Sequence, residues 1–158
     1  MYVPANSLLQ ITGNMTLDAW VKTGTSGGYP YLIAESGSTG YSLNVESDNA
    51  LFLTLATSAT STVTFLSTQA ITTGTWTNVA ATVSIASGTA TVQFYINGAL
   101  SNTRTAAMSA IYSGTGPLIL GCRTNGNNDA LVGLMDQVTI YDTVLTATQI
   151  EQFYTDGL

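Results

Sequence analysis

Residues 78–98 have the sequence NVAATVSIASGTATVQFYING. Apolar side chains occupy every second position over residues 79–85 and again over residues 92–96. Alternation with a period of two predicts β-strands that each turn one face toward a core. Ser87-Gly88 separates the two runs and Asn97-Gly98 follows the second, and such pairs suit the tight turns of hairpins. The segment therefore predicts antiparallel strands joined by short turns.

The same alternation recurs on both sides of this segment. It predicts further strands over residues 15–22, 41–45, 51–55, 62–65 and 118–122, after a strand-like start at residues 1–4. Ser, Asn, Asp and Gly gather between the runs, which is the chemistry of turns. Many short strands at this spacing are typical of a sandwich. We therefore predict an all-β fold, with two antiparallel sheets in a single domain over residues 1–158.

The end of the chain has the pattern of one short helix. Thr146 and Gln149 stand at the spacing of a capping box, and Ile150 and Phe153 follow on one side at helical spacing. Gly157 is suited to ending the helix. Because a helix of about two turns is not stable alone in water, we expect it to pack on the sandwich.

The composition excludes several classes of partner and site. Only 8% of the 158 residues are charged, with 3 Lys+Arg against 9 Asp+Glu and a net charge of −6. Three basic residues are too few for the phosphate contacts of a nucleic-acid-binding protein, and an anionic membrane would repel the chain. With no His and one Cys, a Ser-His-Asp triad, a His-ligated metal and an intrachain disulfide are excluded. No apolar run reaches the roughly 20 residues of a membrane span, so we expect no membrane insertion.

Three segments carry a resemblance to a known family. They are SLLQITGNMTLDAWVK at residues 7–22, GTWTNVAAT with FYING at 74–82 and 94–98, and GLMDQVTIYD with its following helix at 133–154. In order and spacing they resemble the laminin G-like, concanavalin A-like jelly rolls of bacterial and viral surface proteins. The resemblance implies a two-sheet jelly-roll sandwich. It also implies a strand ahead of Tyr2-Val3 that is missing here, so that this edge is open or completed by a neighbouring chain.

The alternation breaks near Asp136, because Met135 and Val138 are both apolar and stand three positions apart. A slip of one residue predicts a β-bulge that re-aims the Asp136 side chain. The resemblance implies a structural calcium ion at Asp136, with backbone carbonyls completing its shell. The alternative is that Asp136 only hydrogen-bonds the backbone near the bulge. The oxygen-rich loop at residues 125–129 is a second candidate for a metal.

Aromatic and amide side chains are candidates for a sugar-binding site. Trp20 and Trp76 are out of register with the core-facing residues of their strands, so either they stack on sugars or other segments, such as the N-terminal stretch, cover them. Tyr29, Tyr31 and Tyr112 fall in or beside Gly-rich loops, where polar side chains can bind hydroxyl groups. The candidate ligand-binding residues are Trp20, Tyr29, Tyr31, Trp76, Tyr112, Asn125, Asn127, Asn128 and Asp129.

The acidic residues do not favour catalysis. Cleavage of a glycosidic bond needs two carboxyl groups about 5–9.5 Å apart. Glu46 and Asp48 form the only close pair and fall at a predicted turn, whereas Asp18 and Glu35 stand alone. We therefore predict that the protein is not an enzyme.

Two roles are compatible with these observations. One is a carbohydrate-binding or adhesion module of a secreted or cell-surface protein, which the resemblance favours. The other is a virion surface or decoration protein that docks onto a protein assembly. A start at Met1 without a signal peptide, the missing first strand and the scarcity of Lys favour this second role. Both roles predict a non-catalytic, extracellular-facing module whose partner is a glycan or a protein assembly, with self-association among the options.

Overall fold

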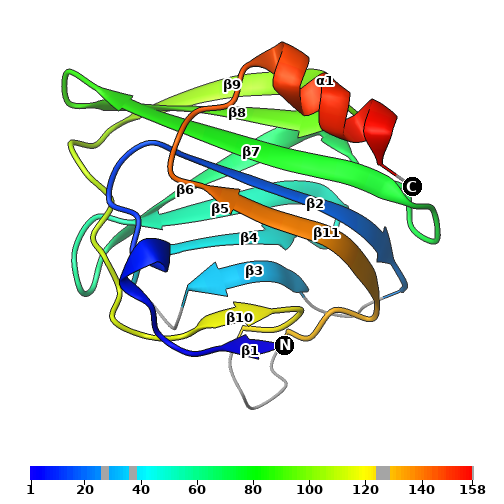
Figure 1. The fold of residues 1–158 in the computed structure, drawn as a ribbon, viewed down its shortest axis with the longest axis horizontal. Helices are drawn as coiled ribbons and strands as arrows, with labels where there is room; N and C mark the ends of the chain where they lie inside the picture. Colours follow the sequence, from blue (N-terminus) through cyan, green and yellow to red (C-terminus); the bar gives the residue numbers. More distant parts are fainter. Residues whose placement is uncertain (26–28, 36–38, 124–128, 158) are drawn as a thin grey trace.

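The computed structural model describes residues 1–25, 29–35, 39–123 and 129–157. Two antiparallel sheets face each other across a shared core (Figure 1). Sheet A has the strand order β1 (Tyr2–Val3), β10 (Leu118–Leu120), β3 (Tyr31–Glu35), β4 (Tyr41–Val45), β5 (Ala50–Ala56) and β6 (Thr62–Ala70). Sheet B has the order β11 (Gly133–Tyr141), β2 (Met15–Thr23), β7 (Thr77–Ala86), β8 (Thr89–Ile96) and β9 (Ala99–Ala107). A 3₁₀ helix, η1 (Ser7–Leu9), and a C-terminal helix, α1 (Ala147–Asp156), complete the fold.

This arrangement confirms the predicted two-sheet antiparallel sandwich with one short C-terminal helix. Each strand predicted from alternation is present, and both Ser87-Gly88 and Asn97-Gly98 form turns with positive φ at both residues. The alternation does not predict β3 or β9. β3 is buried over most of its length and β9 is largely exposed, so neither strand shows one apolar face and one polar face.

The core consists of the inward-facing side chains of both sheets. In β2 and β7 the fully buried members are Met15, Leu17, Ala19, Val21, Val79, Ala81 and Val83. On one side of the sandwich, hydrogen bonds from side chains of β9 join the edge strands β9 and β6. Asn102 Nδ2 and Arg104 Nε donate to the Leu66 carbonyl at 3.0 and 3.2 Å.

The opposite side of the sandwich carries the edge strands β1 and β11. β1 is the outermost strand of sheet A and pairs only with β10, while the Met1 amino group donates to the Leu120 carbonyl at 2.7 Å. In β11 the pairing with β2 shifts between Asp136 and Thr139, and Gln137 has a φ of +48°. The predicted bulge at Asp136 is therefore confirmed.

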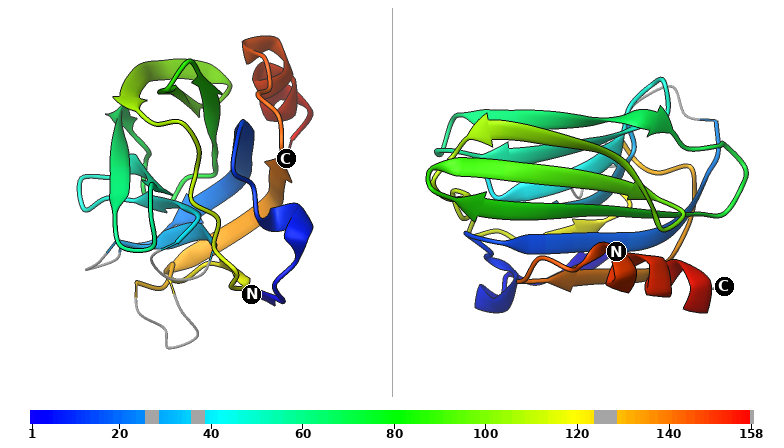
Figure 2. Two further views of the ribbon diagram at one scale, coloured as in Figure 1. Left: turned by 90° about the vertical axis from the view of Figure 1, so that its left-hand side faces the viewer. Right: turned by 90° about the horizontal axis from the view of Figure 1, so that it is seen from above.

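Helix α1 packs on the outer face of sheet B (Figure 2). Its capping box is complete, because Thr146 Oγ1 accepts from Gln149 N and Gln149 Oε1 accepts from Thr146 N. Ile150 is buried against Ala80, Tyr95 and Leu145. Gly157 follows as the C-cap, as expected from the sequence. No helix in the described ranges is long and apolar enough to cross a membrane.

Candidate functional site

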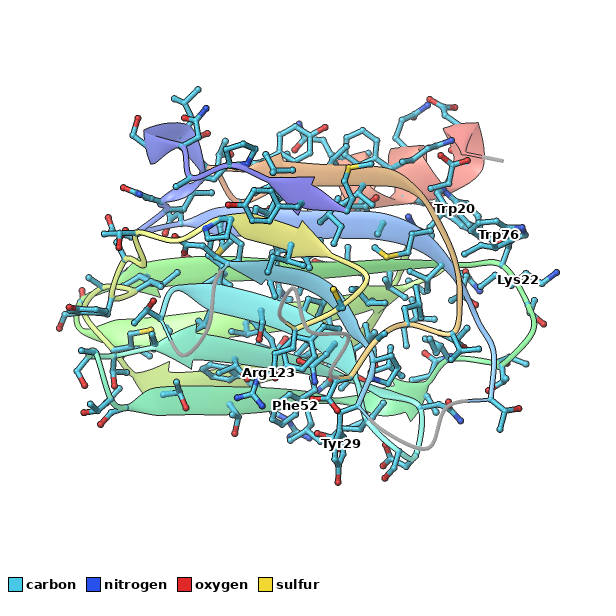
Figure 3. The ribbon with its side chains drawn as sticks, turned by 90° about the horizontal axis from the view of Figure 1, so that it is seen from below. Trp20, Lys22, Tyr29, Phe52, Trp76 and Arg123 are labelled. Carbon is cyan, nitrogen blue, oxygen red and sulfur yellow. The ribbon has the colours of Figure 1, made fainter. Side chains whose placement is uncertain are left out.

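The outer face of sheet A carries a hollow of about 320 Å³, which we call the sheet A hollow. Its wall includes Tyr31, Glu35, Ser42, Thr54, Thr64 and Arg123. The side chains of Arg123, Phe52 and Tyr29 lie on this side of the molecule, whereas Trp20, Trp76 and Lys22 lie at one end of the sandwich (Figure 3). This hollow is the candidate functional site.

Strand register lines up the polar side chains of the hollow. Ser42 of β4 pairs with Thr54 of β5, which in turn pairs with Thr64 of β6. Alternate residues of a strand point to opposite faces. The adjacent residues Leu43, Leu53 and Phe65 therefore enter the core, while the three hydroxyl groups face outward. The result is a row of hydroxyl groups that crosses three strands.

A second outward-facing row runs beside the hydroxyl row and carries aromatic rings. It consists of Tyr31, Asn44, Phe52 and Leu66, which are consecutive partners across β3, β4, β5 and β6. Tyr31 and Phe52 are half-buried, and Leu66 is exposed. Half-buried rings next to hydroxyl groups provide apolar contact area and hydrogen-bonding groups on one surface.

Arg123 supplies the positive charge of the hollow. Its guanidinium carbon lies 5.9 Å from the centroid of the Tyr31 ring, which is a cation–π contact. Within the described residues no carboxylate forms an ion pair with Arg123. The Tyr31 ring therefore lies against the guanidinium group and places its positive charge in the wall of the hollow.

Glu35, the last residue of β3, buries its carboxyl group in the wall of the hollow. The residue is 2% exposed, and neither oxygen has a hydrogen-bond partner in the described part of the chain. The carboxyl group fits there because two residues that lie against it, Gly40 and Gly114, have no side chain. A Cβ on Gly114 would lie 3.1 Å from Oε1, and a Cβ on Gly40 would overlap Oε2.

The environment of Glu35 changes its acidity. Burial raises the pKa of Glu35 to about 7. The Gly114 backbone acts in the opposite direction and lowers this pKa, although it makes no hydrogen bond of normal geometry with either oxygen. At pH values below 7 the Glu35 carboxyl is therefore mostly neutral.

The structure gathers only some of the predicted ligand-binding residues at the hollow. Tyr31 lines it, and Tyr29 is 48% exposed two residues earlier in the chain. The Tyr112 backbone bonds to Gly40 and Ala56, which both line the hollow, and the Asp129 carbonyl accepts from Tyr31 N. Asn125, Asn127 and Asn128 lie outside the described residues.

Trp20 is not available to a ligand, because helix α1 covers it. The residue is 6% exposed, and its ring stacks on Tyr154 with centroids 5.7 Å apart. Gly157 packs so closely on the indole that a Cβ there would overlap Nε1. Of the two alternatives for Trp20, the structure shows cover by another segment and not an exposed ring for sugars, and this cover comes from the C-terminal helix rather than the N-terminal stretch. Trp76 is half-buried and stays a candidate.

The other acidic residues do not join Glu35 in the hollow. Asp48 Oδ1 accepts from Ala50 N within its turn, and Glu46 lies beside a smaller cavity of about 140 Å³. Asp18 is buried on sheet B, where Asn78 Nδ2 donates to both of its oxygens. Burial raises the pKa of Asp18 to about 6, and the hydrogen bond from Asn78 limits the rise. Among the described residues of the hollow, Glu35 is the one acid.

Asp136 has the position that was predicted for it, and its calcium ion stays a prediction. The side chain is exposed, and Oδ1 accepts from Gln137 N at 2.8 Å. No group of three His, Cys, Asp or Glu side chains gathers within the described ranges. An ion at Asp136 would therefore take most of its ligands from backbone carbonyls and water, which calcium accepts.

The sequence interpretation missed Glu35, Phe52 and Arg123 as site residues. Phe52 had a visible signal, because it stands at an outward position between Leu51 and Leu53. Arg123 and Glu35 had none, since their meeting at one hollow depends on how β3, β10 and the turn before β4 come together.

A sequence comparison identifies the family, and a structure comparison identifies proteins with the same fold. The laminin G-like profile of the concanavalin A-like lectin/glucanases superfamily matches residues 1–151. No curated protein matches the chain. The carbohydrate-binding module of the Ruminococcus gnavus IT-sialidase, solved bound to α2,3-sialyllactose, superposes with a TM-score of 0.77 at 13% identity, over 96% of this chain and 94% of that one.

Two toxin domains have the same fold. The binding domain of Paraclostridial Mosquitocidal Protein 1 has a TM-score of 0.76 at 16% identity, and the match covers 98% of this chain. The second is a structure of botulinum neurotoxin type C, a toxin whose cell entry depends on interaction with two ganglioside molecules. It has a TM-score of 0.68 at 16% identity, and the match covers 91% of this chain. The chain spans 40% and 36% of the length of these two structures. The chain belongs to the concanavalin A-like lectin/glucanase superfamily and is a laminin G-like member of it.

Proposed function

We propose that this protein is a non-catalytic carbohydrate-binding module that acts by adhesion outside the cell. The main support is the sheet A hollow, whose wall combines a row of hydroxyl groups with the Tyr31 ring and the guanidinium group of Arg123. Phe52 lies in the outward-facing row beside the hydroxyl groups. Sugars offer apolar ring faces and hydroxyl groups, and both can be matched on this surface. Its volume of about 320 Å³ is at the lower end of the ~300–1,000 Å³ that is usual for small-molecule sites.

The structural neighbours support a glycan as the ligand. The Ruminococcus gnavus module was solved with sialyllactose, and the type C neurotoxin depends on gangliosides. At 13–16% identity these neighbours share the fold with this chain. Glycan binding by the sheet A hollow is therefore a proposal that rests on the hollow's own residues.

We propose that the hollow is not catalytic because of the number of acidic residues in its wall. Glycoside hydrolysis requires two carboxyl groups that flank the bond. The described wall contains one, Glu35, whose oxygens are both buried. The segments outside the described residues contain no Asp or Glu. Hydrolysis of β-glucans or galactans that is lost in Glu46→Gln or Asp48→Asn would contradict this part of the proposal.

A glycan array with three variants tests the proposal. The Tyr31→Ala and Phe52→Ala variants are expected to lose most of the array signal, because Tyr31 lines the hollow and Phe52 lies in the outward-facing row beside it. Tyr2→Ala is the matched control, since Tyr2 is exposed on the edge strand β1 and belongs neither to the hollow nor to the row beside it. Melting temperatures of all variants separate lost binding from lost folding. A wild-type protein that binds no glycan, or ring variants that bind as well as wild type, would defeat the proposal.

Docking onto a protein assembly, including a virion, is the second candidate. It is favoured by an apolar groove of about 460 Å³ on the open side of the sandwich, lined by Met1, Leu120, Leu131, Met135 and Val138. Two features weaken it: β1 is two residues long, and the bulge in β11 interrupts the neighbouring edge. A stable oligomer in sizing experiments together with an empty glycan array would favour docking over glycan binding.

A further inference from the structure

We propose that the glycan bound in the sheet A hollow carries an anionic group, a carboxylate or a sulfate, which pairs with the guanidinium of Arg123. This inference rests on the proposed function and names the class of ligand. It is carried by the charges, contacts and burial of the residues that form the hollow.

Arg123 creates a local reversal of charge. The chain has a net charge of −6 and three basic residues, and one of the three lines the hollow. The other two are placed elsewhere. Arg104 Nε donates to the Leu66 carbonyl where β9 meets β6, and Lys22 projects from one end of the sandwich (Figure 3). No carboxylate of the described residues forms an ion pair with Arg123, and a positive charge in the wall of a hollow attracts an anion.

The contact with Tyr31 presents the guanidinium group in a useful way. A guanidinium is planar and offers a fork of N–H donors that matches the two oxygens of a carboxylate or sulfate. The guanidinium carbon lies over the Tyr31 ring, 5.9 Å from its centroid. Tyr31 is itself held in β3, where its N–H donates to the Asp129 carbonyl at 3.1 Å. The N–H donors of a guanidinium lie along its edges, in its own plane, so an anion would bind there.

The other titratable groups of the wall do not oppose an anion below neutral pH. Burial raises the pKa of Glu35 to about 7, so its carboxyl is mostly neutral below that value. Tyr41 donates its hydroxyl proton to the Leu9 carbonyl, and burial together with the nearby Glu35 raises its pKa far above the physiological range. Tyr31 and Arg123 complete the titratable groups of the wall. The remaining wall is largely Ser and Thr hydroxyl groups, which suit the neutral part of a sugar.

The pH dependence of binding follows from this set of groups. As the pH rises through 7, Glu35 gains a negative charge in the wall of the hollow that Arg123 also lines. Affinity for an anionic glycan should therefore fall over this interval, while affinity for its neutral counterpart should change little. A Glu35→Gln variant should bind the anionic glycan with the same affinity above and below pH 7.

The test is calorimetric titration with a matched set of sugars: lactose, α2,3-sialyllactose and lactose sulfated on galactose. Any matched neutral and anionic pair found on the array can replace lactose and its derivatives. The anionic members are expected to bind about tenfold or more tightly than the neutral one, which is the usual value of a charge-assisted hydrogen bond. The sialylated and sulfated arms separate carboxylate from sulfate as the preferred anion.

Arg123→Gln should lower the affinity for the anionic sugars much more than the affinity for the neutral sugar, so that the preference for the anion is lost. Lys22→Gln is the control, because it makes the same change in net charge away from the hollow. Equal affinities for neutral and anionic sugars, or a preference that survives in Arg123→Gln, would overturn this inference and leave the proposed function standing. A protein that binds neither kind of sugar, in this set or on the array, would overturn the proposed function as well.

Discussion

Glu35 and Asp18 are buried acids on opposite sheets, and burial raises the pKa of both. Each carboxyl is exposed in the unfolded chain, where it loses its proton at lower pH. The folded protein therefore holds these protons more strongly than the unfolded chain does. By linkage, the stability that the neutral carboxyls provide is fully present below the unfolded pKa values and is lost as the pH rises through the folded ones.

The free energy of unfolding should fall between pH 4.5 and about 7 because of Glu35. Glu35→Gln keeps the shape of the side chain and removes the titration, so the fall should become shallower in this variant. Urea unfolding at several pH values measures the effect. The comparison uses the slope against pH rather than the absolute stability, so a general cost of the substitution does not matter. An unchanged slope in Glu35→Gln would show that Glu35 titrates normally.

Gly40 is required beside Glu35 for two separable reasons. Its φ is +86°, and a Cβ there would overlap Glu35 Oε2. Gly74 has a similar φ of +79° but nothing within 4 Å of a Cβ. Gly74→Ala should therefore cost only the backbone strain, about 1–2 kcal/mol, and Gly40→Ala should cost more. If denaturant unfolding gives equal losses for the two variants, the close contact with Glu35 is not significant.

At the level of the secondary-structure elements, α1 depends on its cap and its contact with sheet B. The capping box of Thr146 and Gln149 satisfies backbone N–H groups that the first helical turn leaves free. The covering of Trp20 by Tyr154 and Gly157 is then a consequence of the helix being docked. The intrinsic fluorescence of Trp20 should therefore report the docking of α1.

Thr146→Ala should lower the free energy of unfolding by about 1 kcal/mol, the usual cost of removing an N-cap. Thr148→Ala is the matched control, because Thr148 is exposed within the same helix and has no part in the cap. That variant should be neutral or slightly stabilising, since alanine favours helix. Equal destabilisation of both variants in chemical unfolding would argue against a role for the cap.

The edge strand β11 leads to a prediction about calcium. If the bulge at Asp136 binds the ion, calcium will stabilise the native state by mass action and raise the melting temperature. Asp136→Asn should abolish this rise, and Asp142→Asn, which changes an exposed acid just after the same strand, should retain it. A melting temperature that is the same with calcium and with chelator would exclude a stabilising ion at Asp136.

At the scale of the whole molecule, the two sheets have different outer faces. The outer face of sheet B is partly covered by α1, which buries Ala80, Tyr95 and Ile150. The outer face of sheet A carries the hollow and the row of Tyr31 and Phe52 beside it.

The amino-acid sequence by itself determined most of the strands, the hairpin turns, the bulge and the helix. Each of these is a local matter: strand alternation, turn residues with positive φ such as Asn97 and Gly98, and the capping pair Thr146 and Gln149 act over a few neighbouring positions. β3 and β9 are the exceptions. Their burial does not alternate, so pairing with neighbouring strands defines them more than their own pattern does.

Only the tertiary structure decided which residues form the candidate site. Trp20 and Phe52 both break the apolar alternation of their strands. Helix α1 covers Trp20 on sheet B, whereas Phe52 on sheet A is only half-buried. Likewise Glu35 and Arg123 are separated by most of the chain and share one hollow. Alternation specifies which face of a strand a side chain occupies, but what covers that face depends on segments distant in sequence, because burial is a property of the packed molecule.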